Sequence, residues 1–227
     1  MHTLKLASAL AAGLLSTAAA SAATVTLDFS GTSGYGAQLT EFYNGGTDIP
    51  GSSATPAASG TNYGISFTGS VIVLPSSDGV GTYFSGNDPL SSNPINNAVF
   101  VNPNDVAGVM NIASGFDAFT VTYGAITGAT PTTLTFYSGL NGTGSIIGVL
   151  DLASNSDSCA SAQVCLWSVA SANLGGAVAQ SVDFSGNAGA VLFTNVSVNE
   201  VPLPASGLLL SFGVAGLGLF GARRRAA

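Results

Sequence analysis

Residues 116–123 read Phe-Asp-Ala-Phe-Thr-Val-Thr-Tyr. Phe119, Val121 and Tyr123 alternate with threonines in this stretch, and a period of two places apolar side chains on one face of a β-strand. The segment Thr24–Ser30 repeats the pattern with valine, leucine and phenylalanine. Both segments are therefore predicted to be strands with one buried face and one polar face.

The rest of the central chain has the same character. Short runs rich in valine, isoleucine, phenylalanine, tyrosine and threonine are separated by clusters of glycine, serine, asparagine and proline, and no long stretch has a 3.6-residue apolar period. This pattern predicts an all-β, antiparallel β-sandwich of jelly-roll-like type. The expected strands are Thr24–Ser30, Gln38–Tyr43, Tyr63–Gly69, Val71–Leu74, Ala98–Val101, Phe116–Tyr123, Thr132–Tyr137, Ser145–Leu152, Val164–Ala170, Ala177–Ser185 and Ala190–Val198.

The N-terminus has the pattern of a secretory signal peptide. Lys5 supplies a positive charge, Leu6–Leu15 is apolar, and small residues follow. Ala20 and Ala22 form the small-x-small pattern that signal peptidase accepts. We expect cleavage after Ala22, with cleavage after Ala23 as the alternative, so residues 1–22 are excluded from the fold.

The C-terminus has the pattern of a membrane segment. Residues Leu203–Ala222 carry no charge and are followed by Arg223, Arg224 and Arg225. About 20 apolar residues span a hydrocarbon core, and an arginine cluster favours the cytoplasmic side. The sequence thus predicts a signal peptide (1–22), a β-sandwich ectodomain (23–200) and a tail with a transmembrane helix (201–227).

The ectodomain contains no cationic side chain. All four lysines and arginines and the single histidine lie outside residues 23–200, whereas all eleven acidic residues lie inside, so its formal charge is 0 − 11 = −11. Without cations it is not expected to bind nucleic acid. Without histidine it lacks the base of Ser-His-Asp or Cys-His catalysis and the usual zinc ligands.

Two cysteines, Cys159 and Cys165, lie in this exported segment. An even, closely spaced pair in such a context predicts a disulfide. The spacing is not the C-x-x-C of redox sites, and no basic neighbour would lower a thiol pKa. We expect a structural bridge, with Trp167 packed in the core beside it.

The tail resembles the PEP-CTERM sorting signal, which combines a Pro-x-Pro motif, a membrane helix and a terminal basic cluster. The matching residues are Val201, Pro202, Leu203, Pro204 and the arginine triplet Arg223–Arg225. The resemblance implies processing by an exosortase-type membrane enzyme near Pro202–Pro204, in a Gram-negative host that makes exopolysaccharide. A permanent single-span anchor is the alternative.

Parts of the ectodomain are also similar to PEP-CTERM ectodomains. These parts are Gly115–Phe119, the turn Phe136–Gly144, Val182–Gly186 and Leu192–Val196. Such ectodomains are β-sandwiches, mostly without assigned activity. Their last strand often carries an acidic residue where this chain has Thr194, so the resemblance does not bring a cation site to that position.

Calcium is a candidate ligand, because it takes carboxylate and carbonyl oxygens from loops. Asp78, Asn87 and Asp88 lie in one stretch, and 102–105 is a second acidic and amide-rich stretch. Neither fits a known calcium-loop spacing, and most of the acidic residues are expected in solvated turns. No cofactor is required by the sequence.

The function predicted from these features is that of an exported, non-catalytic surface or matrix protein. It would pass through the inner membrane as an anchored precursor, meet signal peptidase and an exosortase-type enzyme, and associate with exopolysaccharide in the biofilm. Two alternatives stay open: a secreted glycoside hydrolase or lyase that uses aspartate carboxylates, and a structural matrix protein that self-associates through strand edges.

Overall fold

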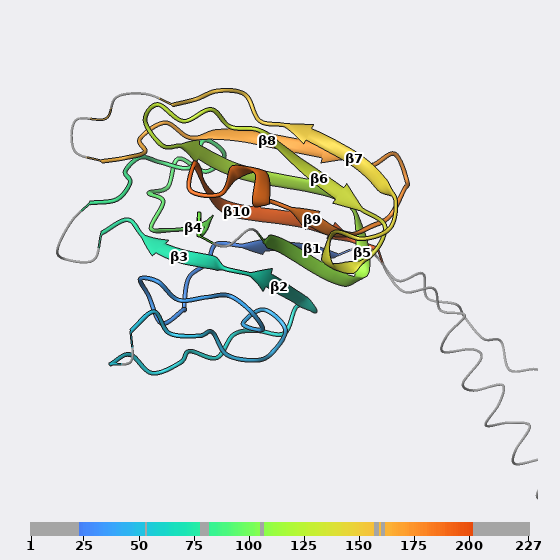
Figure 1. Ribbon diagram of the computed structural model, residues 1–227, viewed down its shortest axis with the longest axis horizontal. Helices are drawn as coiled ribbons and strands as arrows, with labels where there is room; N and C mark the ends of the chain where they lie inside the picture. Colours follow the sequence, from blue (N-terminus) through green and yellow to red (C-terminus); the bar gives the residue numbers. More distant parts are fainter. Residues whose placement is uncertain are drawn as a thin grey trace, which may run out of the picture. The chain divides into compact units, whose positions relative to one another are not determined.

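The computed structural model describes residues 23–52, 54–77, 82–104, 107–156, 159 and 162–201. These residues form an all-β, sandwich-like unit in which every strand pairing is antiparallel (Figure 1). The strands are β1 (Ala23–Leu27), β2 (Ile65–Gly69), β3 (Val71–Pro75), β4 (Asn97–Val101), β5 (Gly108–Ala125), β6 (Thr133–Tyr137), β7 (Ile146–Asp151), β8 (Ser168–Asn173), β9 (Ala179–Asp183) and β10 (Val191–Glu200). Two short 3-10 turns, η1 (Leu140–Gly142) and η2 (Ser185–Asn187), complete the described elements.

The long strand β5 joins two parts of one ten-stranded antiparallel sheet. Its first part, Gly108–Ile112, pairs with β2 and β9, and β9 continues through β6 to the edge strand β7. Its second part, Phe116–Ala125, pairs with β8 on one edge and β10 on the other. The register shifts between Asn111 and Phe116, and Gly115 has a φ of +80° there. One continuous strand thus connects the two layers.

An aromatic core fills the space between the layers. Phe119 lies 5.3 Å from Phe136 and 6.2 Å from Phe184, and Phe184 lies 5.0 Å from Phe193, measured between ring centroids. All four rings are buried. The alternation in 119–123 is confirmed, because Phe119, Val121 and Tyr123 are all buried.

A second, smaller cluster covers the outer face of β4 and β10. Leu192 points into it, next to Phe84, Ile95 and Val164. Trp167 packs edge-on against Phe84 with 5.5 Å between the rings and donates its Nε1–H to the Ser85 carbonyl. Trp167 is thus only partly buried and packs against the edge of this cluster instead of lying in the core. The predicted disulfide between Cys159 and Cys165 is confirmed.

The prediction of a strand at Gln38–Tyr43 is wrong. Gln38 forms only isolated bridges, to Ile49 and Ile72, and the chain then turns, because the amides of Asn44 and Gly46 both bond to the Glu41 carbonyl. Its apolar side chains are nevertheless buried. The Leu39 amide bonds to the Val71 carbonyl, and the preceding Gly36 and Ala37 bond to Val73, so this part of the chain covers the outer edge of β3.

Two strand boundaries also differ from the prediction. The first part of β5, Gly108–Gly115, was not predicted, because its glycines, asparagine and serine read as a turn, yet residues 108–112 are all buried. The strand expected at Val164–Ala170 begins only at Ser168, since Val164 instead forms an isolated bridge to Phe84. Every other predicted strand overlaps an observed one.

The ends of the unit lie side by side. Ala23 is the first residue of β1 and is the register partner of Glu200, the last residue of β10. The Val201 amide bonds to the Gly115 carbonyl. No helix within the described ranges is long and apolar enough to cross a membrane, and the predicted segment Leu203–Ala222 lies outside these ranges.

Candidate functional site

A polar hollow opens where two strands, β4 and β1, diverge from one edge of β10. β4 meets that edge at Phe193, and β1 pairs along it from Val196 to Glu200. Between these pairings β10 has a bulge, where the register against β5 shifts between Thr194 and Ser197. Asn195, inside the bulge, has a φ of +45°, a left-handed conformation that asparagine tolerates better than most residues.

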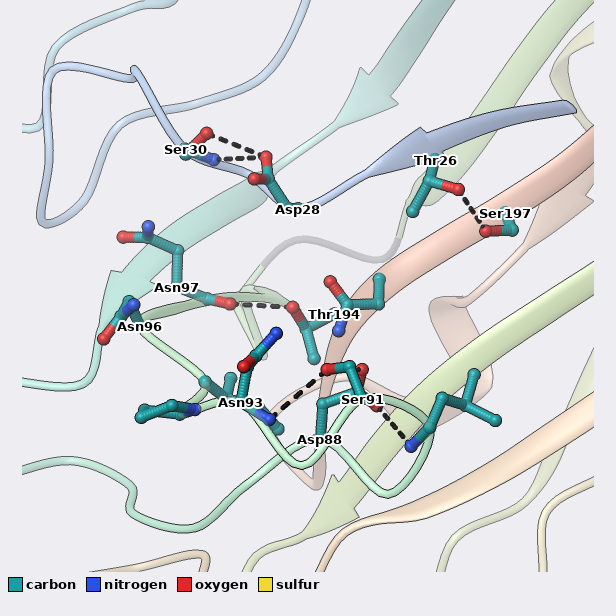
Figure 2. Close-up of a pocket in the computed structure, with 14 residues that line it drawn as sticks. Thr26, Asp28, Ser30, Asp88, Ser91, Asn93, Asn96, Asn97, Thr194 and Ser197 are labelled. Atoms are coloured by element: carbon teal, nitrogen blue, oxygen red, sulfur yellow. Dashed lines mark hydrogen bonds between the residues drawn. The ribbon is translucent and has the colours of Figure 1, made fainter.

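We call this hollow the polar pocket; its volume is about 450 Å³. Apart from Leu90, Pro94 and Ile95, its lining side chains all carry hydroxyl, amide or carboxylate groups (Figure 2). The polar lining residues are Thr26, Asp28, Ser30, Asp88, Ser91, Asn93, Asn96, Asn97, Thr194, Asn195 and Ser197. They come from β1 and the residues after it, from the segment between β3 and β4 with the first residue of β4, and from β10.

Asp88 anchors the segment between β3 and β4 to the sheet. Its carboxylate accepts hydrogen bonds from the Leu90 amide at 3.1 Å, the Ser91 hydroxyl at 2.8 Å and the Thr122 hydroxyl at 3.2 Å. Thr194 adds a second attachment, because its hydroxyl donates to the Asn97 carbonyl at 2.8 Å. Asp88 is only 6 % exposed, and its carboxylate oxygens are used mainly to hold the segment between β3 and β4 in place.

Asp28 is the more available carboxylate of the polar pocket. It is exposed, and its Oδ1 accepts bonds from the amide and hydroxyl of Ser30 at 3.0 and 2.8 Å (Figure 2). Within the described part of the chain its Oδ2 has no hydrogen-bond partner. A carboxylate oxygen accepts hydrogen bonds from hydroxyl, amine or ammonium groups, so this atom is free to meet a ligand.

A second hollow, of about 190 Å³, adjoins the polar pocket and shares Thr26, Asp28 and Ser30 with it. We call it the tyrosine hollow, because Tyr43 and Tyr63 line it. Tyr63 is 39 % exposed, and its ring stacks on that of Tyr43 with 6.2 Å between centroids. The two hollows therefore meet along the Thr26–Ser30 segment.

Tyr43 itself is buried beneath this surface. Its hydroxyl has no hydrogen-bond partner among the described residues. Burial raises the pKa of Tyr43, and the negative charge of Asp28 raises it further. The Phe29 amide is close enough to oppose these effects but lies outside hydrogen-bonding geometry. Tyr43 therefore stays uncharged, and Tyr63 offers the accessible ring.

The turn Phe136–Gly144 has a structural role in this fold. The buried Asn111 on β5 accepts a bond from the Asn141 amide at 2.6 Å and donates to its side chain at 3.0 Å. Ser181 on β9 accepts from the Gly142 amide and donates to the Gly139 carbonyl. These bonds hold η1 against the sheet, and Asn141 supplies the left-handed residue of the turn.

Two of the three predicted calcium ligands, Asn87 and Asp88, lie in the described residues. Asp88 lines the polar pocket, Asn87 is exposed beside it, and Asp78 lies outside the described residues. No group of three histidine, cysteine, aspartate or glutamate side chains that could hold a metal occurs within the described ranges. Asp28 was not among the predicted site residues, although Thr26, Asp28 and Ser30 alternate with buried Leu27 and Phe29.

Most predicted processing residues lie outside the described residues as well. They are Ala20, Ala22, Pro202, Leu203, Pro204, Arg223, Arg224 and Arg225. Ala23 and Val201 are described, and they mark the two ends of the unit. Comparison with known protein families, curated proteins and solved structures finds no match to this chain.

Glu200 gives a test of the end of β10. Burial raises the pKa of its carboxyl group, and its Oε1 has no partner among the described residues. A raised pKa means that the folded state holds the proton more tightly than the unfolded state does. This tighter binding of the proton stabilises the folded state fully below the ordinary glutamate pKa of about 4.3. The stabilisation is lost as the pH rises through the raised pKa of Glu200.

We therefore expect Glu200→Gln to raise the melting temperature at pH 7 and to leave it unchanged near pH 3.5, where the wild-type side chain is also neutral. Thermal unfolding followed by circular dichroism at both pH values measures the difference. Asp151→Asn, at an exposed position on β7, controls for the loss of one negative charge. A melting temperature that falls at pH 7 would show that the Glu200 carboxylate has a stabilising partner.

Proposed function

We propose that this chain is an exported, non-catalytic matrix protein of PEP-CTERM type whose β-sandwich associates with exopolysaccharide. The observation that carries the proposal is the polar pocket, a hollow of about 450 Å³ lined almost throughout by hydroxyl, amide and carboxylate groups. Its size lies in the usual range of about 300–1,000 Å³ for ligand sites. Polysaccharides present hydroxyl groups that both donate and accept hydrogen bonds, and these match the donors and acceptors of the lining.

The arrangement of the ends supports the sorting part of the proposal. β1 begins at Ala23, directly after the expected cleavage site, and β10 ends at Glu200, two residues before Pro202. The fold thus occupies the interval between the two predicted signals. In this proposal a jelly-roll-like sandwich lies between a signal peptide and a transmembrane sorting helix, and signal peptidase and an exosortase-type enzyme release it to the cell surface or matrix.

The disulfide gives weaker support for export. Cys159 and Cys165 are bonded to each other, and such bridges persist mainly in oxidising compartments.

A pull-down with the host's own exopolysaccharide tests the binding part. We expect the full-length protein to be retained and Asn96→Ala to reduce retention, because Asn96 lines the polar pocket with an exposed amide. Gln163→Ala removes an exposed amide outside this lining and is the matched control. The experiment is run with added calcium and with a chelator. No retention under either condition would contradict the proposal.

Mass spectrometry of the protein from its native host tests the sorting part. The expected N-terminus is Ala23, and the expected C-terminus lies near Pro202–Pro204 with residues up to Ala227 removed. Replacement of Pro202 and Pro204 by alanine should cause the uncut form to accumulate. Recovery of the intact chain from the cytosol would refute export altogether.

One observation favours a second candidate, a carbohydrate-cleaving enzyme. Asp28 and Asp88 line the same pocket, and most glycoside hydrolases use two carboxyl groups. Release of reducing sugar by the wild-type protein, abolished by Asp28→Asn, would establish this activity.

A third candidate, self-association, is favoured by the edge strand β7, where Ile146 and Val149 are exposed. Sedimentation of the purified protein would detect it.

A further inference from the structure

The electrostatics of the polar pocket restrict the sugars that it accepts. Asp28 and Asp88 both line it. The chain has no lysine, arginine or histidine between residues 23 and 201, so no side chain of the folded unit can compensate the charge of an anionic ligand. Like charges brought together in a partly desolvated site weaken binding considerably. Uronate-rich or sulfated polymers are therefore disfavoured.

The two carboxylates differ in what they can offer a ligand. Asp88 is buried and bonds to three donors of its own surroundings. Asp28 is exposed, and its Oδ2 is free within the described part of the chain. Asp28 also lines both hollows. A ligand that extends from one hollow to the other would pass this oxygen.

The tyrosine hollow adds a surface suited to a sugar ring. The partly exposed ring of Tyr63 presents an apolar face next to polar groups. Aromatic rings pack against the C–H faces of sugars, and they also attract cations. Tyr63 and Asp28 therefore provide two neighbouring features that both favour a positively charged sugar over a negatively charged one.

We propose that the polar pocket and the tyrosine hollow form one groove for a glycan without negative charges, and that Asp28 gives it a preference for sugars with a free ammonium group. This inference rests on the proposed polysaccharide binding and names the class of polymer. Charge-assisted hydrogen bonds are about twice as strong as neutral ones, so a protonated amino sugar gains more from Asp28 than its N-acetylated form does. The groove requires no metal ion for this recognition.

The test uses the full-length protein, exported through its own N-terminal segment and purified in a mild detergent. Isothermal titration with hexamers of glucosamine, N-acetylglucosamine, glucose and galacturonate is carried out at pH 6 in low salt, with EDTA or with calcium. We expect the glucosamine hexamer to bind about tenfold more tightly than the neutral hexamers. We expect the galacturonate hexamer to bind most weakly, and EDTA to have no effect.

Asp28→Asn isolates the charge, because asparagine retains a side-chain oxygen for the Ser30 bonds. It should reduce the affinity for the glucosamine hexamer about tenfold and leave the affinity for the neutral hexamers within about twofold. Asp151→Asn, on the edge strand β7, should change neither affinity. Tyr63→Ala should weaken the binding of all hexamers that bind.

Several results would overturn the inference alone. These are tightest binding of galacturonate, binding that requires calcium, or an Asp28→Asn variant that keeps the full preference for glucosamine. Retention of the host polymer with any of these outcomes would leave the proposed function standing. Failure of every hexamer and of the host polymer to bind would refute both.

Discussion

Phe119→Ala is expected to destabilise the protein by about 3–5 kcal/mol, the usual cost of removing a buried phenylalanine ring. Phe119 is 1 % exposed. Its ring lies between those of Phe116, Phe136 and Phe184, at centroid distances of 6.3, 5.3 and 6.2 Å. These neighbours come from different strands or from the turn after β9, so they cannot all move to fill the cavity that alanine would leave.

Equilibrium unfolding in urea measures this loss as a shift of the midpoint at unchanged slope. Val149→Ala is the matched control, since Val149 is 54 % exposed on the edge strand β7 and should change the free energy of unfolding by less than about 0.5 kcal/mol. A loss below about 1 kcal/mol for Phe119→Ala would contradict the view that this aromatic cluster is the main core of the sandwich.

The alternation of apolar and polar residues predicted strands that have one buried face and one polar face. In β5, Phe119 and Val121 are buried while Thr120 reaches the Ser171 hydroxyl on β8. The same rule fails for the first part of β5, because Gly108–Ile112 is buried throughout. A segment covered on both faces needs no polar alternation, and its glycines and asparagine then resemble a turn.

At Gln38–Tyr43, in contrast, a strand was predicted and none is formed. Its side chains have the apolar character of a strand, and Leu39, Phe42 and Tyr43 are indeed buried. Strand pairing, however, depends on partners that are distant in sequence, and here the neighbouring Asn-Gly-Gly turn folds the chain back on Glu41. Burial could be predicted from local sequence, whereas the hydrogen-bonding state could not.

For the candidate site, too, the local sequence predicts composition, whereas the position of the site depends on strand pairings between distant segments. Its polar composition follows from the serine, threonine and asparagine content of the chain. Its location depends on the divergence of β1 and β4 from one edge of β10 and on the bulge at Asn195. Asp28 and Asp88 are brought together by strand pairings over more than half the chain, so no motif of short spacing could have joined them.

Gly69→Ala is expected to destabilise the protein by roughly 3 kcal/mol or more, because two independent costs combine. Gly69 ends β2, which pairs with the first part of β5, and only Ser70 separates it from β3, which pairs with β4, so the chain changes pairing partners at this point. Its φ is +81°, and a β-carbon there would lie 1.9 Å from the Ala107 carbonyl oxygen. Backbone would have to move, and the Gly69–Gly108 pairing would move with it.

Gly128→Ala separates these two costs. Gly128 has nearly the same φ, +82°, but a β-carbon there would meet nothing within 4 Å, so only the conformational cost of about 1 kcal/mol remains. Urea unfolding of both variants should therefore give a clearly larger loss for Gly69→Ala. Since Gly69 and Gly108 close the end of the β2–β5 ladder, hydrogen exchange should also become faster in β2 of that variant and stay unchanged in the Gly128 variant. Equal losses for the two substitutions would mean that the close approach of Ala107 does not constrain the turn between β2 and β3.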